Sequence, residues 1–358
     1  MTGEEYMLLY SMSDITFRLT GGTNVGLVRT NNEDNFIVNA DLTHDEWFIP
    51  SDMSNDIKLG EAGCLFVVAD GMGGMNAGEV ASAIAVDSVK DSFNNADLKK
   101  ITGSENKMRD FMHKTIKIAD KNIKKRVAED SSTQGMGTTI VIGWVYNDKV
   151  HISWCGDSRA YLFNAKSGMK RLSKDHSYVQ QLVDEGKLDA ELAFDHPNSN
   201  IITRCLGDSM TEAQPDYTFS PIVEGDMIIL CSDGLCGLCR DEEIIDILNR
   251  YGDDIEQCKA ELISGALNAG GYDNVTVTIF QTKSIEHSDS DTIDISNTSS
   301  DFGKKRDLRL YAKLYKKAIA FLVVVVIILA VWLYFKTNNT ESFTTAIDSV
   351  KNIFNTSR

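Results

Sequence analysis

The sequence predicts an α+β fold with antiparallel sheets, and two observations support this prediction. Extended segments arrive as hairpins, and helical segments arrive in pairs. The clearest hairpin is VIGWVYNDKVHISW (141–154), which turns at Asn147-Asp148 between two apolar stretches. A parallel sheet built from βαβ units would instead alternate single strands with single helices. The block pattern therefore favours antiparallel sheets with helices packed beside them.

The individual elements follow from composition and periodicity. Segments rich in Val, Ile, Phe and Trp are predicted strands, and these are 15–20, 35–39, 64–69, 138–145, 150–155, 160–164, 226–231 and 275–280. Segments with apolar residues at three- and four-residue spacing are predicted helices, and these are 78–92, 107–128, 177–185, 241–250 and 254–268. Together they define one globular domain over residues 15–282.

The C-terminal part differs in composition from this domain. Residues 283–303 are rich in Ser, Asp and Thr, which is typical of a flexible linker. Residues 318–335 (AIAFLVVVVIILAVWLYF) are uncharged and as a helix would span about 27 Å, which favours one transmembrane helix over a buried core helix. The basic segment 304–317 before it predicts a cytoplasmic N-terminal domain and a short extracytoplasmic tail at 336–358. We therefore expect a single-pass protein of the cytoplasmic (inner) membrane.

Charge and cysteine content argue against two kinds of site. The 358-residue chain has 36 Lys and Arg against 52 Asp and Glu, and a formal net charge of −16, so it lacks the basic balance that nucleic-acid binding requires. The seven cysteines are irregularly spaced, mostly within apolar segments, which indicates reduced core thiols. Cys236 and Cys239 form a lone CxxC without a second pair or a nearby His, so we predict no zinc site there.

Carboxylates recur at the ends of predicted strands. Asp70, Asp157 and Asp233 each follow an apolar strand, Asp273 precedes one, and Asp34 lies between two. Carboxylates that converge at one edge would repel each other by about 4 kcal/mol per pair at 4 Å and an effective dielectric near 20. Oxygen ligands without His or thiolate select a hard cation such as magnesium, manganese or calcium. Taken singly, each Asp-Gly pair could also be an ordinary turn.

Eight short motifs occur in the order found in one enzyme family. They are GLVRTNNEDN (26–35), VVADGMGG (67–74), GMGTT (135–139), CGDSRAY (155–161), KDHS (174–177), ITRCLG (202–207), LCSDGL (230–235) and GYDNVTV (271–277). On these motifs the chain resembles the metal-dependent type 2C protein serine/threonine phosphatases (the PPM family), in their bacterial form. The resemblance implies an antiparallel β-sandwich flanked by helix pairs, in α-β-β-α layers, with metals at one end.

The resemblance also implies a set of metal ligands. Asp70 would bridge two Mn²⁺ or Mg²⁺ ions, with the Gly71 carbonyl at the first and Asp233 and Asp273 at the second. A weaker third ion would lie between Asp157 and Asp233. Residues that would act through water or hydrogen bonds next to the ligands are Glu33, Asp34 and Asn274. The implied chemistry is two-metal hydrolysis of a phosphoester.

Arg29 is the expected phosphate clamp, because a guanidinium offers paired donors to two phosphoryl oxygens. The alternative is a surface ion pair with Glu33 four residues on. Many eukaryotic members carry His directly after the DG pair, as the expected acid for the leaving group. Here that position is Met72, which cannot donate a proton, so water is the expected acid.

The other residues in these motifs are expected to have structural roles. They are Arg159, Arg204 and His176, with Thr138 and Thr139 beginning a core strand beside the site. The segment from Ser177 to Asn200 occupies the place where the family has a variable flap, so we expect it to gate the site or select substrate.

Three functions stay open on the sequence alone. The first is a membrane-anchored phosphatase acting on phosphoserine and phosphothreonine proteins, with a membrane serine/threonine kinase and its substrates as expected partners. The second is a catalytically silent phosphoprotein-binding or scaffold domain, which the intact set of expected ligands disfavours. The third is an acidic protein that stores or senses metal, which would have no need of Arg29.

Overall fold

The computed structural model describes residues 14–47, 56–73 and 77–286. The expected transmembrane helix 318–335, the segment 304–317, the tail 336–358 and the linker beyond Glu286 lie outside these residues. Within the described part of the chain, no helix combines the length and apolar character needed to cross a membrane.

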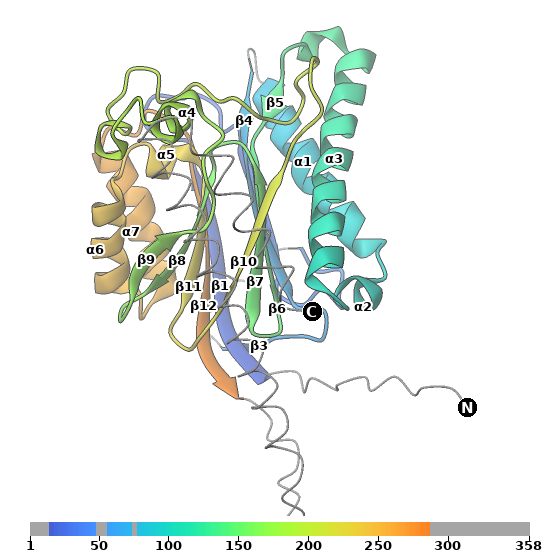
Figure 1. Cartoon of the computed structure of the whole chain (residues 1–358), viewed down its shortest axis with the longest axis vertical. Helices are drawn as coiled ribbons and strands as arrows, with labels where there is room; N and C mark the ends of the chain where they lie inside the picture. Colours follow the sequence, from blue (N-terminus) through green and yellow to red (C-terminus); the bar gives the residue numbers. More distant parts are fainter. Residues whose placement is uncertain (1–13, 48–55, 74–76, 287–358) are drawn as a thin grey trace, which may run out of the picture. The chain divides into compact units, whose positions relative to one another are not determined.

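Two antiparallel sheets pack face to face (Figure 1). The first has the strand order β3 (Ile57–Lys58), β1 (Asp14–Asn24), β12 (Val275–Glu286), β11 (Met227–Cys231), β8 (Arg159–Asn164) and β9 (Gly168–Arg171). The second has the order β10 (Asp216–Pro221), β7 (Lys149–Cys155), β6 (Ile140–Tyr146), β4 (Cys64–Met72) and β2 (Asp34–Asn39), with β5 (Gly137–Thr138) paired to β4. The predicted sandwich of antiparallel sheets is therefore confirmed.

Helices cover the outer face of each sheet (Figure 1). The pair α1 (Ala77–Asn94) and α3 (Glu105–Glu129) packs on the second sheet, and α6 (Asp241–Tyr251) and α7 (Ile255–Asn268) pack on the first. The short helices are α2 (Leu98–Ile101), α4 (Tyr178–Asp184) and α5 (Asp233–Cys236), with 3₁₀ turns η1 (Ser131–Thr133) and η2 (Ala190–Leu192).

Three apolar cores hold these layers together, one under each helix pair and one between the sheets. The central core contains Phe17, Phe66 and Phe280, whose rings stack with centroids 4.8 Å and 5.9 Å from Phe280. Each aromatic ring comes from a different strand, so this stack ties β1 and β12 of one sheet to β4 of the other. Burial of such side chains is the main source of stability for the sandwich.

The structure differs from the sequence-based expectation in four strands. β12 continues through Glu286, because Ile285 pairs with Ile15 on β1, so the first residues of the expected linker belong to the domain. The edge strands β3, β9 and β10 were not predicted. β10 ends in Pro221 and exposes Phe219, and an edge strand that tolerates proline carries a weaker strand signal than a buried one.

All seven cysteines are free thiols. Cys236 and Cys239 are buried within the core under α6 and α7. Six of the seven cysteines are buried, which agrees with the expected core thiols.

His151 on β7 is a buried histidine held against β10. Its Nδ1 lies 2.7 Å from the Tyr217 hydroxyl. Burial lowers the pKa of His151 to about 4, with the charge of Glu105 raising it and that of Lys149 lowering it further. The unfolded chain binds this proton near pH 6.5. Between about pH 4 and pH 6.5 the unfolded state therefore holds more protons, so His151 makes the folded state less stable as the pH falls.

We expect His151→Gln to reduce the pH dependence of unfolding. The loss in free energy of unfolding between pH 7 and pH 4 should shrink by up to about 3 kcal/mol. Urea unfolding followed by tryptophan fluorescence at a series of pH values measures this. His44→Gln, at an exposed position, is the matched control. Equal pH profiles for wild type and His151→Gln would contradict the prediction.

Candidate active site

The carboxylates singled out in the sequence meet at one end of the sandwich. Asp70 lies near the end of β4, and Asp157 lies in the turn between β7 and β8. Asp233 is the first residue of α5 and is separated from the end of β11 only by Ser232. Asp34 opens β2 and is the direct cross-strand partner of Asp70. Asp273 lies just before β12, so both sheets contribute carboxylates to this end.

Asp34 is buried between the two sheets. Its Oδ2 accepts a hydrogen bond of 2.7 Å from the Ser232 hydroxyl, which links β2 to the end of β11. Burial raises the pKa of Asp34 to about 8 against the opposing hydrogen bonds from Thr276 and Ser232. The group is therefore held in an environment that disfavours an uncompensated negative charge.

Asp70 and Asp233 face each other across the space between the sheets. Burial raises the pKa of both, and their mutual hydrogen bond raises the pKa of Asp70 further while it opposes the upward shift of Asp233. Burial, followed by the charge of Asp233, also raises the pKa of Asp157 well above its usual range. These shifts show that negative charge is crowded at this end of the sandwich.

Glycines after two of these carboxylates permit the close approach of the chain. A Cβ at Gly71 would lie 2.2 Å from the Gly78 carbonyl oxygen and 2.4 Å from that of Glu33. A Cβ at Gly234 would lie 1.9 Å from the Asn274 carbonyl oxygen. Only glycine fits at either position, so the DG pairs at 70–71 and 233–234 are required by packing of the backbone at the site.

Arg29 and Asp273 form an ion pair, with 2.7 Å between Arg29 Nη2 and Asp273 Oδ2. Both side chains are partly exposed. The sequence suggested Glu33 as the alternative partner of Arg29, but the contact found is with Asp273. The hydrogen bond to Asp273, opposed by desolvation, raises the pKa of Arg29.

Asn274 fixes the loop that carries Arg29. Its Nδ2 donates to the carbonyl oxygens of Val25 and Asn31 at 2.9 Å each. Its Oδ1 accepts from the Glu33 backbone N–H at 2.8 Å. One buried side chain therefore holds the β1–β2 loop against the start of β12. Burial raises the pKa of Glu33, opposed by the charge of Arg29.

Thr138 and Thr139 hold the Asp70 backbone. The Thr138 hydroxyl and the Thr139 N–H both donate to the Asp70 carbonyl oxygen at 2.8 Å. Thr138 lies at the end of β5 and Thr139 between β5 and β6, so both threonines lie against the Asp70 backbone just before the core strand β6.

The donor set fits hard divalent cations. The positive side chains that act on Asp233 are Arg29 and Arg159, and each already has a carboxylate partner, Asp273 and Asp175 respectively. The remaining charge of Asp70, Asp157 and Asp233 is thus uncompensated among the described residues, and oxygen-only donors of this kind suit Mg²⁺ or Mn²⁺. As the described side chains stand, no group of three or more His, Cys, Asp or Glu is arranged to hold a metal ion, and the Asp273 carboxylate pairs with Arg29.

A cleft of about 760 Å³ adjoins the carboxylates. Its walls include Asp157, Asp233 and Asp273, and both ends of the expected flap, Ser177 and Asn200. The segment 177–200 therefore lies along the cleft, and its role as a flap stays a prediction.

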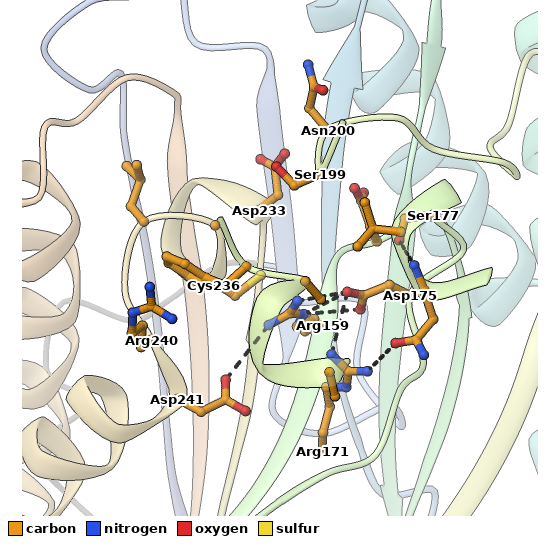
Figure 2. Close-up of a pocket in the computed structure, with 18 of the residues that line it drawn as sticks. Arg159, Arg171, Asp175, Ser177, Ser199, Asn200, Asp233, Cys236, Arg240 and Asp241 are labelled. Carbon is orange, nitrogen blue, oxygen red and sulfur yellow. Dashed lines mark hydrogen bonds and ion pairs between the residues drawn. The ribbon is translucent and has the colours of Figure 1, made fainter. Parts of the chain in front are cut away.

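The lining of the cleft includes an ion-pair network around Arg159 (Figure 2). Arg159 was expected to have a structural role, and its partners were not predicted. The Arg159 guanidinium donates to the Asp175 carboxylate, with 2.8 Å from Nη2 to Oδ2, and to the Tyr161 hydroxyl at 3.0 Å. Tyr161 in turn donates to Asp241 at 2.9 Å. Arg159 and Asp175 fall in the CGDSRAY and KDHS motifs, but nothing in their spacing indicates that they pair.

Arg240 connects the flap to α6. Its Nη2 lies 2.6 Å from Asp195 Oδ2, and its guanidinium lies over the Phe194 ring at 4.3 Å from the centroid. No sequence signal distinguishes this arginine from other surface arginines.

His176 has the structural role expected of it. Its Nδ1 accepts the Gly156 N–H at 3.1 Å, and its Nε2 lies 3.2 Å from Asp216 Oδ2. Its backbone carbonyl accepts the Thr203 N–H at 2.7 Å. Arg204 Nη1 approaches the same Asp216 at 3.2 Å. The two ends of the flap are therefore joined to each other and to the turn that carries Asp157.

Comparison with known proteins gives a consistent result. The family model described as "Protein phosphatase 2C" matches residues 51–268. The chain is 34% identical over 217 residues to a serine/threonine phosphatase of Listeria innocua, covering 61% of this chain and 84% of the relative. It is 33% identical over 261 residues to protein phosphatase PhpP of Streptococcus pneumoniae, covering 72% of this chain and 94% of the relative.

A solved structure adds information about metals. The catalytic domain of the serine/threonine protein phosphatase PstP, in complex with two manganese ions, is 28% identical with a TM-score of 0.59, and the match covers 75% of this chain and 99% of that one. The family match spans more than half of the chain, and the Streptococcus relative is matched over more than two thirds of it. On this evidence the chain belongs to the protein phosphatase 2C family of metal-dependent serine/threonine protein phosphatases.

Proposed function

We propose that this phosphatase hydrolyses phosphoserine and phosphothreonine in proteins at a two-metal site between the ends of its two sheets. The observation that carries the proposal is the crowding of Asp70, Asp157 and Asp233, whose pKa values are all raised, beside an arginine that can bind phosphate. Such crowding costs free energy unless cations bind.

The ligand roles are proposed as follows. Asp70 would be a ligand of both of two Mn²⁺ or Mg²⁺ ions, with the Gly71 carbonyl oxygen as a further ligand of the first and Asp233 and Asp273 as ligands of the second. Asp157 with Asp233 would hold a weaker third ion. When bound, divalent cations lower the pKa of water toward neutrality and compensate charge on the phosphoryl oxygens.

The chain's own residues orient the substrate and the ligands. Arg29 binds two phosphoryl oxygens with its paired donors. Asn274 keeps the Arg29 loop in place through Val25, Asn31 and Glu33. Glu33 and Asp34 act beyond the ligands by accepting hydrogen bonds from water. Because Met72 offers no proton, a water molecule protonates the leaving group.

We further propose that the catalytic domain is held at the inner face of a bacterial cytoplasmic membrane. The uncharged stretch 318–335 and the basic residues before it support this. Substrates would then be membrane-associated phosphoproteins, including a membrane serine/threonine kinase and its targets. The flap 177–200 is proposed to select among them.

One experiment tests both parts. The full chain is expressed in a bacterial host, and membrane and soluble fractions are assayed with p-nitrophenyl phosphate plus Mn²⁺, Mg²⁺ or EDTA. A host expressing Asp70→Asn gives the background. We expect metal-dependent activity, removed by EDTA, in the membrane fraction.

The possible outcomes separate the claims. Activity that EDTA leaves intact would contradict the metal site, and activity confined to the soluble fraction would contradict the anchor. A folded chain with no activity in either metal would favour a silent phosphoprotein-binding domain.

A further inference from the structure

An exposed apolar surface lies beside the proposed phosphate-binding arginine. Leu27 and Val28 directly precede Arg29, and Tyr272 directly precedes Asp273. Their exposed fractions are 67%, 61% and 63%. We call Leu27, Val28 and Tyr272 the apolar shelf. Single exposed apolar residues are ordinary, but several at one place indicate an interaction site.

The shelf is built on a rigid base. The Leu27 N–H donates to the Gly271 carbonyl oxygen at 2.7 Å, and the Arg29–Asp273 ion pair joins the same two loops. Gly26 has a φ of 81° and approaches so closely that a Cβ there would lie 2.3 Å from the Asp273 carbonyl oxygen. Large apolar side chains are therefore held outward on a fixed backbone, which lowers the entropic cost of binding a partner.

The position of the shelf identifies its occupant. Tyr272 lines the same cleft as Asp233 and Asp273, so the shelf adjoins the place where the phosphate would bind. Consecutive Cα atoms of a peptide are about 3.8 Å apart, so the residues next to a phosphoserine or phosphothreonine held by Arg29 fall within reach of the shelf. Arg29 would bind the phosphate itself, and the acidic chain, with a net charge of −16, offers little attraction for further acidic groups, so apolar contact with the neighbouring side chains is the additional source of affinity.

We infer that the apolar shelf binds an apolar side chain next to the phosphorylated residue of the substrate. The enzyme would then prefer phosphosites flanked by residues such as leucine over sites flanked by small polar residues. This inference rests on the proposed function and names the substrate class for that same site.

The test measures kcat/KM for the full chain with Mn²⁺ on three substrates. These are p-nitrophenyl phosphate, a nine-residue phosphothreonine peptide with leucine on both sides of the phosphothreonine, and the same peptide with serine at those positions. The variants are Val28→Ser and Tyr272→Ser. The matched control is Val223→Ser, because Val223 is exposed to a similar degree, 57%. Val223 precedes β11, whereas Asp233 follows the other end of that strand.

We expect the wild type to prefer the leucine peptide by about tenfold. Val28→Ser and Tyr272→Ser should each lose most of this preference while changing hydrolysis of p-nitrophenyl phosphate by less than about twofold. Val223→Ser should behave as wild type. If Val28→Ser folds poorly, the nearly isosteric Val28→Thr is compared with Val223→Thr.

Three results would overturn the inference. They are equal wild-type rates on both peptides, an undiminished preference in both shelf variants, and a parallel loss on all three substrates, which would mean that the shelf acts through Arg29. Absence of hydrolysis of every substrate would refute the proposed function instead. In that case the affinity of each labelled peptide, measured by fluorescence anisotropy, would decide the role of the shelf separately.

Discussion

Replacing Asp233 with asparagine is expected to abolish phosphatase activity and, at the same time, to stabilise the metal-free protein. The negative charge of Asp233 raises the pKa of both Asp70 and Asp157. Without it two proposed metal sites lose a ligand, and we expect kcat/KM for p-nitrophenyl phosphate to fall by about a thousandfold or more. Removing one negative charge from a buried cluster should raise the free energy of unfolding in EDTA by about 1 to 2 kcal/mol.

The two effects have opposite signs, which distinguishes this mechanism from simple damage to the fold. The matched control is Asp226→Asn at the other end of β11, where Asp226 accepts hydrogen bonds from Asn164 Nδ2 and the Val223 N–H at 2.7 Å and 2.8 Å. That substitution should lower stability and leave activity intact. Thermal unfolding in EDTA and initial rates in Mn²⁺ measure both quantities. An Asp233→Asn protein that is less stable than wild type in EDTA would show that the carboxylate cluster is not under repulsion.

Replacing Arg29 with lysine is expected to lower kcat/KM by about a hundredfold. The change keeps the positive charge but removes the paired donors that match two phosphoryl oxygens. Arg29→Ala should lower kcat/KM further, because it removes the positive charge as well. Arg29 also pairs with Asp273 at 2.7 Å. The alanine substitution removes this partner, so Asp273 becomes available to bind metal. The Mn²⁺ concentration for half-maximal activity should therefore fall.

The control for this prediction is Arg18→Lys on β1, since Arg18 pairs with Asp56 at 2.7 Å and does not contact the carboxylate cluster. Rates measured over a Mn²⁺ titration separate the effect on catalysis from the effect on metal affinity. Full activity in Arg29→Lys would show that a point charge suffices and that Arg29 does not act as a paired donor.

Much of the fold was predictable from the sequence because the central strands are long apolar runs. β4, β6, β7 and β11 are buried over nearly their whole length, and such runs are recognised without knowledge of their partners. The edge strand β10 was not predicted, because it is half exposed and ends in proline. The long helices α1, α3, α6 and α7 were predicted because each has one apolar face against a sheet.

The candidate site was predictable in its residue types but not in its contacts. The ordered motifs identified Asp70, Asp233 and Arg29, yet no motif indicates that Arg29 pairs with Asp273. Pairing depends on how two loops approach, and glycine packing at Gly26 and Gly271 decides that. Arg240 and Phe194 are likewise far apart in the sequence and carry no local signal.

The first and last described strands of the domain, β1 and β12, lie side by side as one ladder from Asp14–Glu286 to Asn24–Val275. Arg29 and Asp273 are separated by 244 positions in the chain, and Ser232 and Asp34 by 198. Contacts of such high sequence separation form late and slowly in folding. During translation, β1 can pair only with the two-residue strand β3 until β12 leaves the ribosome. The nascent chain should therefore have no phosphatase activity until synthesis of the whole domain is complete, so a truncated translation product could not dephosphorylate its targets prematurely.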